Sequence, residues 1–277
     1  MKPVSVSEQM MFSTVRLEAT DGSSGTGFFF NFMFDEKLVP VLITNKHVVN
    51  NNPREVMKFQ LHLCNLANPT VSLNESFTVT YQTDWIFHSK HDLCFTFVKP
   101  LFEEVHKRTG KLVFSIPITE DLIYDAKKLE DLSALEQVVM VGYPNGLWDQ
   151  IHNYPLFRRG YTSAHPAYDF NRDGVGVVDM ACINGSSGSP IFILDEGGYL
   201  DKNTKSFNLQ GRIIFLGILF EGPQKLEIGE LVNVDLKMQQ KTVSVAKSLI
   251  NLGYYIKSYE LNEFRVYIEK MLGEGRR

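Results

Sequence analysis

Short runs of β-branched and aromatic residues, each broken by turn residues after a few positions, recur along most of the chain. This texture is typical of an all-β fold, because such side chains suit a pleated, half-buried surface and the breaks mark tight turns. Phenylalanine occurs 20 times and tryptophan twice, which favours strands with aromatic packing over long helices. The sequence predicts strands at 11–18, 27–34, 39–44, 58–64, 77–81, 93–98 and 113–116, and a second series at 137–141, 158–163, 175–180, 190–194 and 212–220.

The two series of strands are similar in size and are separated by a charged, helix-tolerant stretch at 120–136. The segment 258–277 differs, because apolar residues recur there at helical spacing. We expect a C-terminal helix that Ser258 caps and Gly273 ends. Its docking stripe on the β-body would be Leu261, Phe264, Ile268 and Leu272.

Composition argues against several classes of protein. The 28 basic and 32 acidic side chains leave a net charge of −4, which gives no electrostatic case for nucleic acid or an anionic membrane as partner. The longest strongly apolar run, at 213–220, is too short to cross a bilayer. The N-terminus lacks the apolar core of a secretory leader, and Cys64, Cys94 and Cys182 form no clustered pattern. We therefore expect a cytoplasmic location with free thiols.

The strongest local signal is a serine flanked by glycines between two strand-like runs, in Asn184-Gly185-Ser186-Ser187-Gly188-Ser189-Pro190. A serine hydroxyl is a weak nucleophile that needs a base and an exposed, tightly turned backbone. Glycines permit such a turn and leave backbone N–H groups free to face a developing oxyanion. A plain polar turn between two strands explains the same residues equally well.

Two further segments place a histidine and an acid at the ends of apolar strands. His47 follows the run Leu42-Ile43-Thr44, and an imidazole there could act as a general base because its ordinary pKa lies near neutrality. Asp92 opens the strand-like run at 93–98, and a carboxylate that enters an apolar strand needs a partner. Each residue taken alone is more often structural than catalytic.

Taken together, the three segments resemble the trypsin-like serine peptidases of the chymotrypsin fold, in particular the bacterial branch without disulfides. The likeness covers most of the chain and keeps the family's order of His, Asp and Ser. It rests on a catalytic-histidine motif, an Asp-Leu-Ala segment and a Gly-x-Ser-Gly-Gly-Pro motif, which correspond here to Thr44-Asn45-Lys46-His47-Val48-Val49, His91-Asp92-Leu93-Cys94 and Gly185-Ser186-Ser187-Gly188-Ser189-Pro190. Segments 23–29, 141–144 and 159–163 match strands of the family as well.

The resemblance implies an all-β fold of two packed antiparallel β-barrels (chymotrypsin-like) with a C-terminal helix. We expect an N-terminal barrel over 1–118 that carries His47 and Asp92, and a connector over 119–136. A C-terminal barrel over 137–257 would carry Ser187, followed by the helix and tail over 258–277.

The resemblance also implies a role for each catalytic residue. His47 would be the general base and then the general acid, Asp92 would fix the tautomer of the imidazole, and Ser187 would attack the scissile carbonyl. The backbone N–H groups of Gly185 and Ser187 would form the oxyanion hole.

Three further residues would line the substrate pocket by the same resemblance, namely Ala181, Phe220 and Gly222. The Ala181 methyl group offers no counter-charge, so the base of the pocket would be uncharged and unsuited to Lys or Arg. Asp179 lies close in sequence and would restore a basic preference if it reached the pocket.

The chain departs from the family at two points. Ser186 replaces the aspartate that pairs with a new amino terminus in secreted relatives, and no Arg-Ile-Val-Gly-Gly sequence occurs near the start. We therefore expect no zymogen activation of that kind. Phe220 stands where a serine usually supports the catalytic aspartate, so one supporting hydrogen bond is in doubt.

Two weaker motifs suggest metals. Asp169-Phe170-Asn171-Arg172-Asp173-Gly174 fits the opening of a calcium loop, although its twelfth position is Met180 and a hairpin turn explains the segment better. His88-x-x-His91-Asp92 suggests a metal pair or a phosphohydrolase, but no second His/Asp cluster accompanies it.

The function that these observations predict is a serine endopeptidase that hydrolyses protein or peptide substrates through an acyl-enzyme. We expect no metal and no organic cofactor, an activating or targeting partner protein, and no nucleic acid or membrane partner. The alternative is a catalytically weak or inactive protease homologue that binds peptide or protein in the same cleft. A third hypothesis is a calcium-dependent binding module centred on 169–173.

Overall fold

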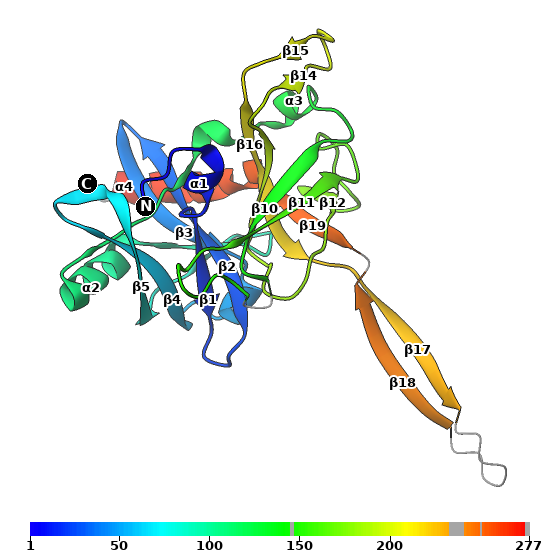
Figure 1. Cartoon of the computed structure of the whole chain (residues 1–277), viewed down its shortest axis with the longest axis horizontal. Coiled ribbons are helices and arrows are strands. Elements are labelled where there is room, and N and C mark those ends of the chain that lie inside the picture. The colour runs from blue at the N-terminus through cyan, green and yellow to red at the C-terminus, as the bar shows by residue number, and fades with distance from the viewer. Residues whose placement is uncertain (145–146, 233–240, 250, 275–277) are drawn as a thin grey trace.

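The computed structural model describes residues 1–144, 147–232, 241–249 and 251–274, with the backbone alone for 224–232 and 241–249. Strands dominate and form two large β units with two smaller hairpins (Figure 1). The C-terminal helix, drawn in red, lies across the first unit.

The first β unit is a nine-stranded sheet. Its strands are β1 Thr14–Glu18, β2 Ser24–Phe34, β3 Lys37–Thr44, β4 Val56–Asn65, β5 Asn68–Gln82, β6 Ile86–Phe87, β7 Cys94–Phe97, β8 Leu112–Val113 and β9 Ile118–Thr119. The main path runs antiparallel in the order β5-β4-β1-β2-β3-β7-β6, with β8 on β4 and β9 parallel to β2. The register Thr44↔Cys94 brings the end of β3 beside the start of β7.

The second β unit is a closed antiparallel barrel of six strands. These strands are β10 Gln137–Gly142, β11 Leu156–Thr162, β12 Val175–Asp179, β13 Pro190–Asp195, β16 Arg212–Glu221 and β19 Leu252–Lys257. They pair around the barrel in the order β10-β11-β12-β19-β16-β13.

Two hairpins leave the second unit. One pairs β14 Tyr199–Leu200 with β15 Phe207–Asn208. The other pairs β17 Gln224–Val232 with β18 Lys241–Leu249 and projects away from both β units (Figure 1). The sequence predicts neither hairpin.

Helices are short and lie outside the two β units. They are α1 Val6–Met10, α2 Lys99–Thr109, α3 Ala126–Leu129 and α4 Asn262–Glu274, with one-turn 3-10 helices at His47–Val49, Glu120–Leu122 and Ser258–Leu261. The expected C-terminal helix is confirmed, but its expected ends are wrong. Ser258 lies inside the 3-10 turn that precedes α4, where Lys257 is the flanking residue and no side chain caps the turn. The helix also continues through Gly273 to Glu274.

An apolar core joins the two units and α4. Phe28 of β2 packs edge-on against Phe215 of β16, with ring centroids 5.5 Å apart. Phe264 of α4 packs on Phe95 of β7 at 4.8 Å. Leu261, Phe264 and Ile268 are buried as expected, whereas Leu272 is 41% exposed. The all-β class, with two packed antiparallel units and a C-terminal helix, is therefore confirmed, while the expected residue boundaries of the parts stay a prediction.

None of the helices in the described residues has the length and apolar character needed to cross a membrane.

A buried histidine, His62, predicts that the stability of this fold depends on pH. His62 of β4 packs against both Phe12 and Tyr154, with ring centroids 4.8 Å and 5.7 Å away, and burial lowers its pKa to about 4. In the unfolded chain its pKa returns to about 6.5, so the unfolded state binds the extra proton and stability is lost as the pH falls below that value. We expect the His62 contribution to cost about 2 kcal/mol of unfolding free energy at pH 5 relative to pH 7.5.

Urea unfolding at pH 7.5 and pH 5.0 measures this loss. The variant His62→Phe keeps an aromatic ring against Phe12 and cannot titrate, so it should lose less stability between the two pH values than the unaltered protein. An equal loss in both proteins would show that His62 does not carry the effect.

Candidate active site

The His47 and Asp92 side chains meet where β3 ends beside β7. His47 opens the one-turn 3-10 helix directly after β3, and Asp92 lies in the loop between β6 and β7. His47 Nδ1 lies 2.5 Å from Asp92 Oδ2, and the His47 backbone N–H donates to Asp92 Oδ1 at 3.2 Å. The two side chains are 42% and 29% exposed, so the pair is open to solvent while the carboxylate engages both the ring and the backbone of His47.

Two asparagines hold this pair in place. Asn45 is fully buried, and its Nδ2 donates to the Asp92 carbonyl at 2.7 Å. Asn50 ends the His47 turn in the left-handed region, with φ of 54°, and its N–H donates to the His47 carbonyl at 3.1 Å. With the Nδ1–H donated to Asp92, the Nε2 lone pair of His47 is the basic position of the ring.

The Ser187 loop joins β12 to β13 and turns sharply at two glycines. Gly185 and Gly188 have φ values of 83° and 84°, in the left-handed region that favours glycine. At Gly188 an added Cβ would also collide with the Thr26 carbonyl oxygen and with Thr44 Oγ1. The backbone geometry therefore favours glycine at both positions, and the lack of space requires it at Gly188.

Thr26 of β2 ties the Ser187 loop to the first β unit. Its backbone N–H donates to the Ser187 carbonyl at 2.9 Å, and its Oγ1 donates to the Gly185 carbonyl at 3.1 Å. Thr44 Oγ1 donates in turn to the Thr26 carbonyl at 2.8 Å, three residues before His47. These contacts bring the loop of Ser187 to the strand end that carries His47.

Over residues 185–189 of the described chain, the amides of Ser186, Gly188 and Ser189 are hydrogen-bonded and two are not. Those of Ser186 and Gly188 donate to the carbonyls of Ile183 and Leu219 at 3.0 Å and 2.8 Å. Those of Gly185 and Ser187 have no acceptor within the described part of the chain. The two N–H groups expected to form an oxyanion hole therefore have no acceptor among the described residues, as is also true of the amides at 181–184 earlier in the same loop.

Ser187 is half-buried at the tip of the loop. Over the described ranges its hydroxyl has no hydrogen-bond partner, so the Ser187–His47 bond of a closed triad is not formed in this structure. Such bonds are often long or poorly aligned without substrate and tighten in the complex. The structure therefore supplies the His–Asp contact and brings the serine loop to the same strand end.

The three residues expected to bind substrate lie in the second β unit, in the loop after β12 and at the end of β16. Ala181 is exposed, and Phe220 and Gly222 are half-buried at the end of β16 and just beyond it. An added Cβ at Gly222 would lie 3.2 Å from the Cys182 carbonyl oxygen, so Gly222 lies directly beside Cys182. Phe220 also packs against the core that joins the two units.

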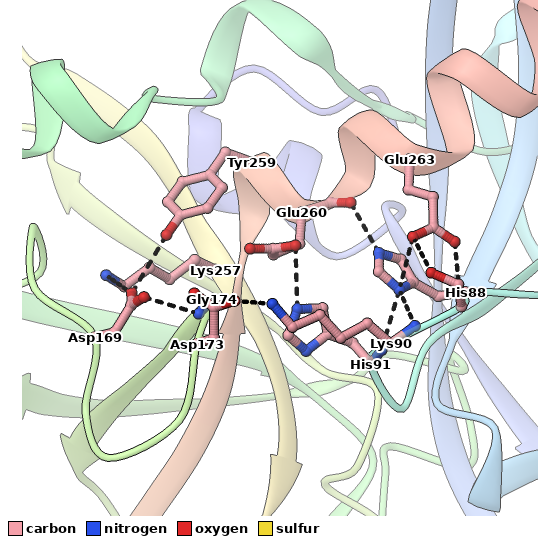
Figure 2. Close-up of polar contacts among 11 residues, drawn as sticks. His88, Lys90, His91, Asp169, Asp173, Gly174, Lys257, Tyr259, Glu260 and Glu263 are labelled. Carbon is pink, nitrogen blue, oxygen red and sulfur yellow. Dashed lines mark hydrogen bonds and ion pairs between the residues drawn. The ribbon is translucent and has the colours of Figure 1, made fainter.

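A polar cluster fixes the loop that carries Asp92 to the C-terminal segment (Figure 2). The Ser89 backbone N–H and hydroxyl both donate to the Glu263 carboxylate, at 2.5 Å and 2.6 Å. His91 directly precedes Asp92 in the chain, and its Nε2 lies 3.1 Å from Glu260 Oε2. His88 Nδ1 accepts from the amides of Lys90 and His91, and burial lowers the pKa of His88. Glu260 and Glu263 therefore both hold the loop that carries Asp92 against the C-terminal segment.

The same cluster extends to the loop before β12 (Figure 2). Lys90 pairs with Asp173, and the fully buried Lys257 donates to Asp169 Oδ1 at 2.7 Å. Partial burial alone would raise the pKa of Asp169, but the hydrogen bonds from Lys257 and the Gly174 amide outweigh it and lower that pKa.

These contacts bear on the two metal-site hypotheses, the calcium loop at 169–174 and the metal pair at His88 and His91. Asp169 and Asp173 of the calcium-like segment form ion pairs with lysines. The His88 ring forms hydrogen bonds with backbone groups. In the described part of the molecule, no group of three or more His, Cys, Asp or Glu side chains is placed to hold a metal ion.

The solved structures that are similar to this chain include two proteases or protease relatives. One is the serine protease of a human pathogenic astrovirus, with a TM-score of 0.42 and 10% identity over 89% of each chain. The other is the scabies mite inactivated protease paralogue S-I1, with a TM-score of 0.46 and 12% identity over 95% of this chain and 96% of that chain. No protein-family model and no curated protein sequence matches the chain.

Proposed function

We propose that the chain is a serine endopeptidase that cleaves protein or peptide bonds, with His47, Asp92 and Ser187 as its triad. The observation that carries the proposal is the 2.5 Å contact between His47 Nδ1 and Asp92 Oδ2, at the strand end to which Thr26 and Thr44 fasten the Ser187 loop. A polar turn needs neither such a pair nor the unpaired amides beside it.

In the first half-reaction, Ser187 Oγ attacks the carbonyl carbon of the cut bond while its proton passes to His47 Nε2. Asp92 accepts the Nδ1–H and stabilises the imidazolium that forms. The amides of Gly185 and Ser187 donate to the developing oxyanion. The carbon–nitrogen bond then breaks, His47 gives its proton to the leaving amine, and an acyl-enzyme remains.

In the second half-reaction, a water molecule gives a proton to His47 Nε2 and attacks the acyl carbon. The carbon–oxygen bond to Ser187 breaks, and the proton returns to Ser187 Oγ. The atoms balance without a metal ion or an organic cofactor.

The second candidate function is peptide or protein binding without turnover. The observation that favours it is the Ser187 hydroxyl, which has no partner in the described residues, together with Phe220 at the place of a supporting serine. Such a protein would hold an extended peptide along the 220–222 segment and release it uncut.

A fluorophosphonate probe separates the two. Only an activated serine attacks the phosphorus atom and displaces fluoride, so we expect covalent labelling at Ser187, located by mass spectrometry of the digested protein. The folded variant His47→Ala should not be labelled, because it lacks the base. Absence of labelling in the folded, unaltered protein would favour the binding function.

A further inference from the structure

Arg158 of β11 reaches the segment that leads to Ser187. Its Nη1 donates to the Ala181 carbonyl at 2.5 Å, and its side chain is half-buried. Burial raises the pKa of the Cys182 thiol to about 12, and the positive charge of Arg158 opposes part of that rise. The next residue, Arg159, points to the opposite face of the strand and is exposed.

A bound substrate would bring a side chain to this place. The residue before the cut bond must put its carbonyl at the amides of Gly185 and Ser187, and its side chain then runs along the 181–185 segment. The opposite boundary is close, since Gly222 and Gly253 both pack against Cys182, where an added Cβ at Gly253 would collide with Cys182 Sγ. Glycine at both positions therefore lets these two segments pack closely on Cys182.

Among the residues that the structure describes, the guanidinium of Arg158 has no anionic partner. Among the described arginines, six form an ion pair with a carboxylate, and these are Arg16, Arg54, Arg108, Arg172, Arg212 and Arg265. Within the same described residues, neither Arg158 nor the exposed Arg159 has one; Arg158 is half-buried and uses a single N–H group on Ala181. A half-buried cation without a counter-ion is costly, and the planar fork of a guanidinium fits a carboxylate with two parallel hydrogen bonds.

We infer that Arg158 selects substrates with Glu or Asp before the cut bond, an inference that rests on the proposed function. The uncharged Ala181 supplies no competing acid, and Asp179 lines a separate hollow with Tyr161 and Ala164. The base of the expected pocket is therefore cationic through Arg158, a residue that the sequence pattern does not single out.

Fluorogenic peptides that differ only at the residue before the cut test this preference. We expect kcat/KM to be highest for Glu or Asp, lower for Gln and Leu, and lowest for Lys. Arg158→Met should reduce kcat/KM for the acidic peptides roughly 10- to 100-fold, because a charge-assisted hydrogen bond is lost, and leave the Leu peptide within about threefold. The matched control Arg159→Met, on the exposed face of the same strand, should leave the whole profile unchanged.

The outcomes separate the two proposals. If Ser187 reacts with the fluorophosphonate but the unaltered protein prefers a neutral or basic residue, the role of Arg158 is overturned and the peptidase stands. An equal loss on all peptides in a folded Arg158→Met protein overturns it in the same way. If the unaltered protein neither labels nor cleaves, the peptidase proposal fails and this inference fails with it.

Discussion

Replacing Ser187 with alanine should reduce kcat on a cleavable peptide by roughly 10⁴- to 10⁶-fold. The hydroxyl oxygen forms the bond to the acyl group, so its loss removes the acyl-enzyme route entirely. The amides of Gly185 and Ser187 remain in place and would support only residual catalysis by bound water. Turnover of a quenched peptide by purified protein, compared with the unaltered protein at equal concentration, measures the loss.

The same variant should keep its fold. Ser187 is half-buried, and its hydroxyl makes no hydrogen bond with the described residues, so we expect the free energy of unfolding to change by about 0.5 kcal/mol or less. Thermal melting of both proteins checks this. A folded Ser187→Ala protein that retains turnover within tenfold of the original would exclude Ser187 as the nucleophile.

Much of the fold can be predicted from local sequence texture. The aromatic run at 27–34 predicts a strand, and β2 spans Ser24–Phe34 with most of its side chains buried. The apolar runs at 190–194 and 212–220 become β13 and β16, which pair with each other in the barrel. Such runs are informative because a strand buried on both faces cannot afford polar residues.

Helix α2 and the β17–β18 hairpin are not predicted from the sequence, because neither has a strong local signal. Helix α2 starts at Lys99 with Pro100 in its first turn, and it buries only Leu101 and Val105, one helical turn apart. Two apolar positions are too few to mark a helix beside a strand-rich background. The β17–β18 hairpin is formed by two strands that pair with each other and not with the barrel, so no core pattern identifies it.

The candidate site, like the fold, has parts that the sequence identifies and parts that only the structure shows. The segments around His47, Asp92 and Ser187 are recognisable because the chemistry needs those residue types in a fixed order. The contacts that assemble them come from residues far apart in the chain, such as Thr26 on Ser187 and Arg158 on Ala181. No local pattern distinguishes these two residues from other polar strand residues, so only the folded structure reveals them.

Replacing Asp92 with asparagine should reduce kcat about 10⁴-fold and leave KM nearly unchanged. In the structure, both carboxylate oxygens of Asp92 accept from His47, one from the backbone N–H and one from the ring Nδ1–H. Asparagine has a single acceptor oxygen. If that oxygen keeps the backbone N–H, the amide NH₂ faces Nδ1 and forces the ring proton onto Nε2, where His47 can no longer act as the base.

Steady-state kinetics of Asp92→Asn against Asp84→Asn test this geometry. Asp84 forms an exposed ion pair with Arg54 at 3.5 Å, so the same chemical change there should leave both kcat and KM within about twofold. Because asparagine fills the same volume as aspartate, the peptide cleft should stay intact and substrate binding should persist. A fall in kcat of less than tenfold for Asp92→Asn, in a protein that Ser187→Ala inactivates, would show that the 2.5 Å contact does not orient the imidazole and that another group sets its tautomer.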